Sequence, residues 1–231
     1  MTKIHGLRSK KKKENILIEI LGQIDCGKKE IGDLVAKKLG ATYLSFPLLF
    51  NLDSPTASIL RNALIHSPRV LEANPQWWAH IYMAHLQEVK DKINAALEHG
   101  PVVVTNYVMA FRVWARAASF DIDTCYIGFT AGLPQPTCAF TIIGDKLESY
   151  RNLDVDFSPS FILSVNRGML FVSDKKVLKK VYGLTKGQTK ATSFNKCADD
   201  ICYSLHKKYK LNVLEHIKFT PGSFTNRTSN G

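Results

Sequence analysis

An apolar run of strand length leads directly into a glycine-bounded loop and then an amphipathic segment. The run covers residues 16–21, and residues 22–28 read GQIDCGK, which has the form G-x-x-x-x-G-K. Apolar residues then recur at helical spacing up to Gly40, which is suited to ending a helix. A strand, a short loop and a helix in this order are typical of an α/β protein with a parallel sheet.

The loop has the composition of a phosphate-binding P-loop. Glycines let backbone N–H groups approach phosphate oxygens, and the N-terminus of the following helix adds partial positive charge. Lys28 is then placed to reach the outer phosphates; a glycine-bounded turn without a ligand is the alternative. The predicted nucleotide-binding residues of the loop are Gly22, Asp25, Cys26, Gly27, Lys28 and Lys29.

One position of the loop departs from the usual pattern. A serine or threonine that ligates Mg²⁺ normally follows the lysine, whereas this chain has Lys29. A cation at this point opposes Mg²⁺ binding and supplies part of the charge that the metal would bring. The sequence therefore predicts no metal ligands, and ATP with Mg²⁺ is expected only if the protein is an active enzyme.

Composition excludes several classes of protein. With 231 residues, 45% of them apolar, the chain can form one domain with a sizeable core. No apolar run of about 18 residues predicts a membrane-spanning helix, and no apolar segment of a secretory signal follows the basic N-terminus. Five cysteines without a C-x-x-C pair favour reduced thiols, and hence the cytoplasm or nucleus.

The net charge of +11 is concentrated at the two ends. Residues 1–14 carry six basic side chains and one acidic side chain. We expect a basic disordered arm (1–14), a folded domain (15–212) and a polar tail (213–231). The arm is a solubilising tail, a nuclear signal or a nucleic-acid patch. Lysines that would extend a nucleic-acid surface are Lys179, Lys180, Lys186, Lys190, Lys196, Lys207, Lys208 and Lys210.

Proline, glycine and asparagine divide the rest of the chain into alternating strands and helices. Strands are predicted over 41–46, 102–104 and 138–143, with a weak one over 189–192. Helices are predicted over 56–64, 74–97, 108–118, 173–182 and 195–209, and residues 144–167 show no clear periodicity. The pattern predicts a P-loop NTPase-like parallel sheet of four or five strands with helices on both faces. Ligands would bind at the carboxyl edge of this sheet.

The order of elements resembles the thymidylate kinase family of P-loop nucleoside monophosphate kinases over residues 16–209. Partial matches to the family's motifs carry the resemblance, and they occur in the same order as in the family. They are Phe46-Pro47 after the second strand, residues 81–88 (IYMAHLQE) in the place of L-F-x-A-N-R-x-E, Thr105-Asn106-Tyr107 in the place of D-R-Y, residues 132–137 (GLPQPT) in the place of G-L-P-x-P-D, and residues 175–182 as the helix after the lid. The chain thus resembles a diverged member, of a viral-type or degenerate kind, with a lid over 145–170.

The resemblance implies roles for single residues. Phe46, Pro47 and Tyr107 would border the nucleoside, with Thr105 and Asn106 beside it. Lys28 would hold the donor phosphates, and the lid residues Arg151 and Arg167 would clamp the transferring phosphoryl group. Residues 166–168 also fit a hairpin turn, which would leave Arg167 structural.

Departures from the family fall on charged positions. Thr105 and Asn106 replace the aspartate and arginine of D-R-Y, and Leu86 replaces the arginine of the long helix. The family's acidic residue before the first glycine has its nearest counterparts in Glu19 and Asp25. Losses of this kind typically cost orders of magnitude in the rate of phosphoryl transfer.

Two functions follow from this pattern. One is ATP-dependent phosphorylation of a nucleoside monophosphate such as dTMP, as in nucleotide biosynthesis. The other is a pseudoenzyme, a kinase-fold protein without turnover that serves as an interaction or nucleic-acid-associated module. The resembled family commonly dimerises through long helices, which makes residues 75–97 a candidate homodimer face.

Overall fold

The computed structural model describes residues 15–24, 26–46, 54–66, 69–119, 128, 130–143, 158–170, 181–183, 190–211 and 213. In this part of the chain five strands form one sheet in the order β2-β3-β1-β4-β5, and all neighbours are parallel. The strands are β1 (Leu17–Gly22), β2 (Thr42–Ser45), β3 (Val102–Thr105), β4 (Cys138–Ile143) and β5 (Val181–Gly183). The predicted α/β fold with a parallel sheet is therefore confirmed.

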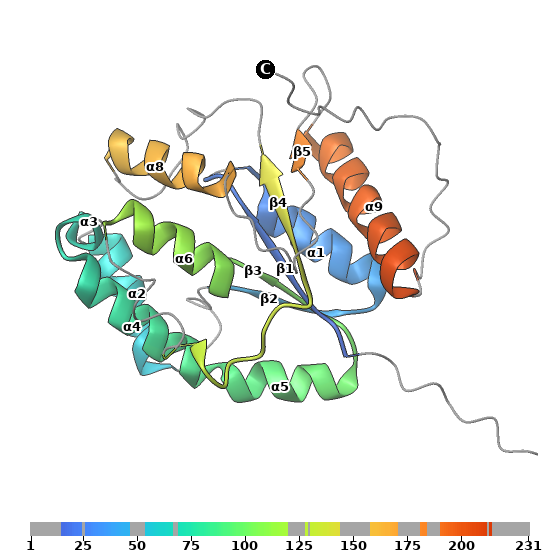
Figure 1. Ribbon diagram of the computed structural model, residues 1–231, viewed down its shortest axis with the longest axis horizontal. Coiled ribbons are helices and arrows are strands. Elements are labelled where there is room, and N and C mark those ends of the chain that lie inside the picture. Colours follow the sequence, from blue (N-terminus) through green and yellow to red (C-terminus); the bar gives the residue numbers. More distant parts are fainter. Residues whose placement is uncertain are drawn as a thin grey trace, which may run out of the picture.

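Helices cover both faces of the sheet (Figure 1). Helices α1 (Lys28–Leu39) and α9 (Lys190–Tyr209) lie together on one face. The opposite face carries α2 (Pro55–His66), α3 (Val70–Ala73), α4 (Pro75–Glu88), α5 (Lys90–His99), α6 (Val108–Ala117) and α8 (Pro159–Leu170). None of the described helices is long and apolar enough to cross a lipid bilayer.

Strand β1 supplies both hydrophobic cores. Leu17 and Leu21 belong to the cluster under α4, α6 and α8, whereas Ile18 and Ile20 belong to the cluster under α1 and α9. Successive side chains of a strand point to opposite faces, so a continuous apolar run can serve two layers. Glu19 is the exception, because it is a fully buried carboxylic acid within this run.

Local sequence signals set the starts of α2 and α4. Ser54 Oγ accepts the N–H of Ala57 at 3.0 Å, and a proline takes the first position of α2. Asn74 accepts the N–H of Trp77, again with a proline next. The predicted long helix over 74–97 is instead two helices, because Val89, with ψ of −2°, interrupts the regular helix between α4 and α5.

Helix α8 corrects the prediction for residues 144–167. Its apolar residues are buried at helical spacing, which the sequence analysis did not detect, and a hairpin turn at 166–168 is excluded. The buried residues are Phe161, Ile162, Val165 and Met169. The part of the predicted lid over 145–157 lies outside the described residues.

Two predictions near the C-terminus are also wrong. Residues 181–182 were predicted at a helix end but lie in β5, because they pair with β4 and extend the sheet. Residues 190–192 were predicted as a strand but begin α9, whose apolar face is buried against α1 and β1. The rest of the predicted helix over 173–180 lies outside the described residues.

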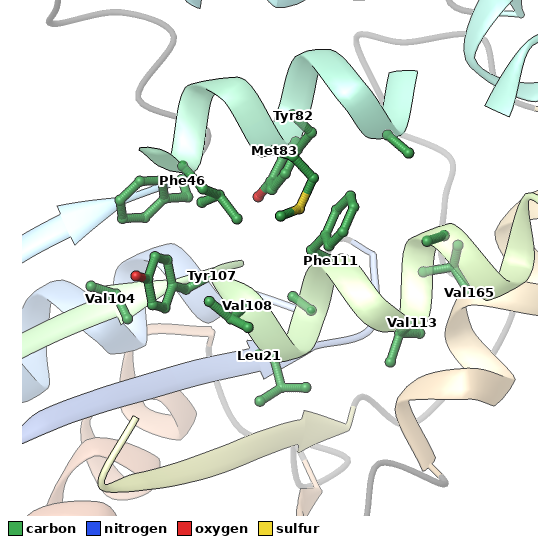
Figure 2. Packing of buried hydrophobic residues seen from close by; sticks show 14 of the residues in the cluster. Leu21, Phe46, Tyr82, Met83, Val104, Tyr107, Val108, Phe111, Val113 and Val165 are labelled. Atoms are coloured by element: carbon green, nitrogen blue, oxygen red, sulfur yellow. The ribbon is translucent and has the colours of Figure 1, made fainter. Parts of the chain in front are cut away.

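An aromatic cluster fills the space between α4, α6 and the sheet (Figure 2). Tyr82 and Phe111 stack with ring centroids 5.1 Å apart and planes 7° apart. Phe46 and Tyr107, each 0% exposed, lie beside them with centroids 5.3 Å apart. The ends of β2 and β3 are therefore covered by side chains that pack on one another.

Removing the ring of Phe111 tests this cluster. We expect Phe111→Ala to lower the free energy of unfolding by about 3–5 kcal/mol, because it leaves a cavity against Tyr82. Phe111→Leu, which keeps most of the volume, should cost clearly less. Urea unfolding of both variants measures the difference. Equal losses for the two variants would contradict the packing described.

Candidate functional site

The glycine loop (residues 22–28) connects β1 to α1 at the carboxyl edge of the sheet. Gly27 has φ of 77°, in the left-handed region that favours glycine, and Lys28 is the first residue of α1. The first N–H groups of α1 have no partner within the helix, so they and the helix dipole favour an anion at this end. Asp25 lies outside the described residues.

Three hydrogen bonds fix the first half of the glycine loop. The N–H of Gln23 donates to the carbonyl of Ile142 at 3.2 Å, which ties the loop to β4. The N–H of Ile24 donates to Oδ1 of Asn166 at 2.8 Å. Lys28 Nζ donates to the carbonyl of Gln23 at 3.0 Å, so its side chain spans the loop from the last residue to the second.

Close contacts require both glycines of the loop. A Cβ at Gly22 would lie 2.5 Å from the carbonyl oxygen of Ile142. A Cβ at Gly27 would lie 2.2 Å from Cζ of Phe194, so α9 packs directly against the loop. The loop thiol of Cys26 is only 2% exposed and belongs to the apolar cluster under α1 and α9.

The residues at this edge do not fit a Mg²⁺ site. Lys29 is exposed, and its carbonyl accepts the hydroxyl of Tyr43 at 3.0 Å. Thr105, in the place of the family's aspartate, is buried and donates to Ser45 Oγ at 3.2 Å. Burial raises the pKa of Tyr43, which keeps its hydroxyl neutral. A chain of neutral hydroxyls thus stands where a carboxylate would ligate the metal.

Glu19 is not available as a metal ligand either. Both of its carboxylate oxygens accept the N–H of Met109 at 3.1 Å, and Oε1 also accepts the N–H of Ala110 at 3.0 Å. Glu19 therefore caps the first turn of α6 from β1. Burial raises its pKa to about 7, against the lowering effect of the backbone hydrogen bonds. No group of three or more His, Cys, Asp or Glu side chains among the described residues is placed to hold a metal.

The residues predicted to border a nucleoside lie together but contact one another. Asn106, with φ of 54°, donates from Nδ2 to the carbonyl of Phe46 at 3.2 Å, and its backbone carbonyl accepts the hydroxyl of Tyr82. Tyr107 packs against the ring of Phe46. Leu86, in the place of the family's arginine, is 0% exposed in the same apolar cluster. A guanidinium there would be buried among apolar groups, at a cost of several kcal/mol.

A polar cluster between α2 and α4 was missed by the sequence analysis. Thr56 Oγ1 donates to Glu88 Oε2 and lies 3.1 Å from Nδ1 of His85 and 3.1 Å from Ser54 Oγ. His85 is 0% exposed, and burial lowers its pKa, which keeps the ring neutral. The spacing of His85 and Glu88 on one helix face was the available signal. The cluster joins α2 to α4, whose His85 ring packs edge-on against the ring of Phe46.

The structure brings the predicted site residues together only in part. Thr105 ends β3, Asn106 and Phe46 directly follow β3 and β2, and the described glycine-loop residues start at the end of β1. All of them therefore lie at the same edge of the sheet, as the topology predicts. Arg167 is exposed on α8, next to Asn166, and lies in a helix. Asn166 and Glu19 contribute contacts that the sequence analysis did not anticipate. Arg151, Pro47 and Asp25 lie outside the described residues.

A parallel sheet in this order, with a glycine loop after β1, has the P-loop nucleoside monophosphate kinase fold. Solved thymidylate kinases share it. The Candida albicans enzyme matches with a TM-score of 0.67 and 15% identity over 87% of this chain and 95% of that chain. The Ehrlichia chaffeensis enzyme matches with a TM-score of 0.61 and 14% identity over 82% of this chain and 98% of that chain. No protein-family model and no curated protein sequence matches the chain. The predicted resemblance to thymidylate kinases is confirmed for the fold.

The cap of α6 predicts a pH dependence of stability. The pKa of Glu19 in the folded state, about 7, lies above its ordinary value of 4.5, so the folded state binds the proton more tightly. The stability from this group is present at low pH and lost as the pH rises through about 7. Glu19→Gln removes this titration and keeps an oxygen that accepts the α6 N–H groups. Relative to Glu19→Gln, wild type should lose about 3 kcal/mol of unfolding free energy as the pH rises from below 4.5 to above 7, because each pKa unit corresponds to about 1.4 kcal/mol.

Urea unfolding of both proteins at a series of pH values makes the measurement. Other titrating groups contribute equally to both proteins, so the difference isolates Glu19. Parallel pH profiles would show that the carboxyl titrates as it does in the unfolded chain.

Proposed function

We propose that this protein binds the phosphates of a nucleotide at the glycine loop and has lost efficient thymidylate kinase turnover. The observation that carries the proposal is the contrast between the two halves of the candidate site at the carboxyl edge of the sheet. The half around Gly27 and Lys28 keeps a left-handed glycine, a lysine and a helix N-terminus. The half around Phe46, Tyr107 and Leu86 is apolar core.

The chemistry of the glycine loop suits a polyphosphate. In the proposed complex Lys28 Nζ exchanges the carbonyl of Gln23 for phosphate oxygens, and the first N–H groups of α1 donate to the same anion. Lys29, exposed in the first turn of α1, adds a second cation. These two consecutive lysines would supply part of the charge that Mg²⁺ supplies in other sites of this kind.

The acceptor half lacks what phosphoryl transfer requires. The transferring group carries negative charge that positioned cations must neutralise. Leu86 and Thr105 stand in the places of two charged residues of the resembled family, and both are buried. Phe111 stacks on Tyr82 in the space between α4 and α6, so a planar base would have to displace it.

A second candidate is ATP-dependent phosphorylation of a nucleoside monophosphate such as dTMP. It is favoured by the position of Arg167 beside Asn166, whose side chain contacts the glycine loop. In this candidate Lys28 holds the donor phosphates, Arg167 and Arg151 clamp the transferring group, and Phe46 and Tyr107 border the base. It requires the aromatic cluster to open.

Two partners belong to the proposal. The exposed lysines Lys196, Lys207, Lys208 and Lys210, with the basic arm of residues 1–14, offer a surface for nucleic-acid phosphates, whose binding would weaken steeply with salt. A second copy of the chain would dock on residues 75–97, where Trp77 is 37% exposed.

Nucleotide binding tests the role of Lys28. We expect Lys28→Ala to weaken ATP binding by about 10–100-fold, the value of a hydrogen bond to a charged group. Lys37→Ala is the matched control, because Lys37 is exposed near the other end of α1. Isothermal titration calorimetry provides the affinities. ATP binding that is equally strong in Lys28→Ala would contradict a phosphate site at the glycine loop.

ADP formation separates the two candidates. Purified protein with ATP, Mg²⁺ and dTMP should form ADP no faster than Lys28→Ala does. Turnover that disappears in Lys28→Ala would favour the second candidate and reject the loss of activity.

Replacing Lys29 tests the unusual charge of the loop. We expect wild type to bind ATP with similar affinity in Mg²⁺ and in EDTA. Lys29→Thr restores a hydroxyl that can ligate the metal, and its ATP affinity should fall about tenfold or more in EDTA relative to Mg²⁺. Lys37→Thr should behave as wild type. A wild-type protein that loses ATP binding in EDTA would contradict the proposed role of Lys29.

A further inference from the structure

The glycine loop receives a buried hydrogen bond from a helix far away in the sequence. Asn166 lies on α8, is 1% exposed, and its Oδ1 accepts the N–H of Ile24 at 2.8 Å. Ile24 is itself only 6% exposed. A buried N–H that loses its acceptor cannot be rehydrated easily, so this contact has a large influence on the loop backbone.

Helix α8 is held firmly enough to act as a support. The N–H and the hydroxyl of Ser158 both donate to the carboxylate of Glu72, which ties the start of α8 to α3. Ser158 Oγ in turn accepts the N–H of Phe161 at 3.2 Å and caps the helix. Near its other end, Gly168 allows close approach to α6, since a Cβ there would lie 2.7 Å from Val113 Cγ1.

The contact completes the fixation of the first half of the loop. The N–H of Gln23 donates to the carbonyl of Ile142 in β4, a bond that remains when Lys28 Nζ leaves the Gln23 carbonyl for phosphate oxygens. With the next N–H bound by Asn166, the chain direction is set on both sides of residue 23. Two successive N–H groups at the start of the loop are therefore held by other elements of the fold.

We propose that Asn166 is a positioning residue of the phosphate site: by binding the N–H of Ile24 it holds the glycine loop in the shape that receives a nucleotide. This role rests on the proposed function of the loop. Asn166 itself would touch no phosphate and acts through the backbone of the loop. Helix α8, in the segment that the resemblance assigns to a lid, then serves as a fixed support for the loop.

Three variants test the role. Asn166→Leu keeps the size of the side chain without an acceptor, and Asn166→Asp keeps an oxygen acceptor. Ser164→Ala, at an exposed position of the same helix, is the control. Hydrogen exchange of the Ile24 amide reports the contact directly, and calorimetry reports ATP affinity.

We expect Asn166→Leu to speed exchange of the Ile24 amide and to weaken ATP binding, each by about tenfold. Asn166→Asp should retain protection of that amide, whereas a purely space-filling role would make Leu the better replacement. Ser164→Ala should match wild type in both readouts. If Asn166→Leu fails to fold, Asn166→Ser, whose hydroxyl is too short to reach the same point, replaces it.

The outcomes separate this proposal from the one on which it rests. Wild type that binds ATP, with unchanged affinity and unchanged Ile24 protection in Asn166→Leu, overturns the positioning role alone. Wild type that fails to bind ATP overturns the phosphate site, whatever the amide exchange shows.

Discussion

The hydrogen bonds from α6 to the carboxylate of Glu19 join the two halves of the candidate site. Glu19 lies three residues before the glycine loop, and α6 starts directly after Thr105-Asn106-Tyr107. A carboxylate in the middle of an apolar strand is costly, and the N–H groups of a helix start are the partners that offset this cost. Because the two elements share these hydrogen bonds, a shift of either one would leave the N–H groups of α6 without an acceptor and the buried carboxyl of Glu19 without donors. The spacing between the glycine loop and the start of α6 is therefore fixed from within the core.

How far the sequence predicts this fold depends on the distance over which each signal acts. The strands at 16–21, 102–104 and 138–143 are short apolar runs between turn residues, and the sequence was sufficient to place them. Strand β5 forms because it can pair with the free edge of β4, and the residues 181–183 alone do not predict this pairing. Helix α8 was missed because its buried face is divided by Asn166, a polar residue that is explained only by its partner in the loop.

The same reasoning applies to the site. The glycine loop could be located because its sequence pattern is local, and the motifs of the resembled family led to Phe46 and Tyr107, which follow β2 and β3 at the carboxyl edge of the sheet. Contacts between residues 19 and 109, or 24 and 166, join segments that no periodicity relates. The sequence showed which charges are missing, and the structure shows what replaces them. Thr105, Ser45 and Tyr43 bind one another as neutral groups, so this edge does not need a metal ion to balance buried charge.

The contact between Gly27 and Phe194 has a consequence for biosynthesis. The glycine loop is synthesised well before the ring that packs against it, which arrives only when α9 is made. Until then the apolar cluster of β1, α1 and α9 lacks the side chains of α9, and Gly27 has no neighbour on that side. Long-range contacts of this kind form late in folding. A chain that already contains the whole G-x-x-x-x-G-K motif, but in which α9 has not yet packed against it, would therefore still lack the loop shape described above.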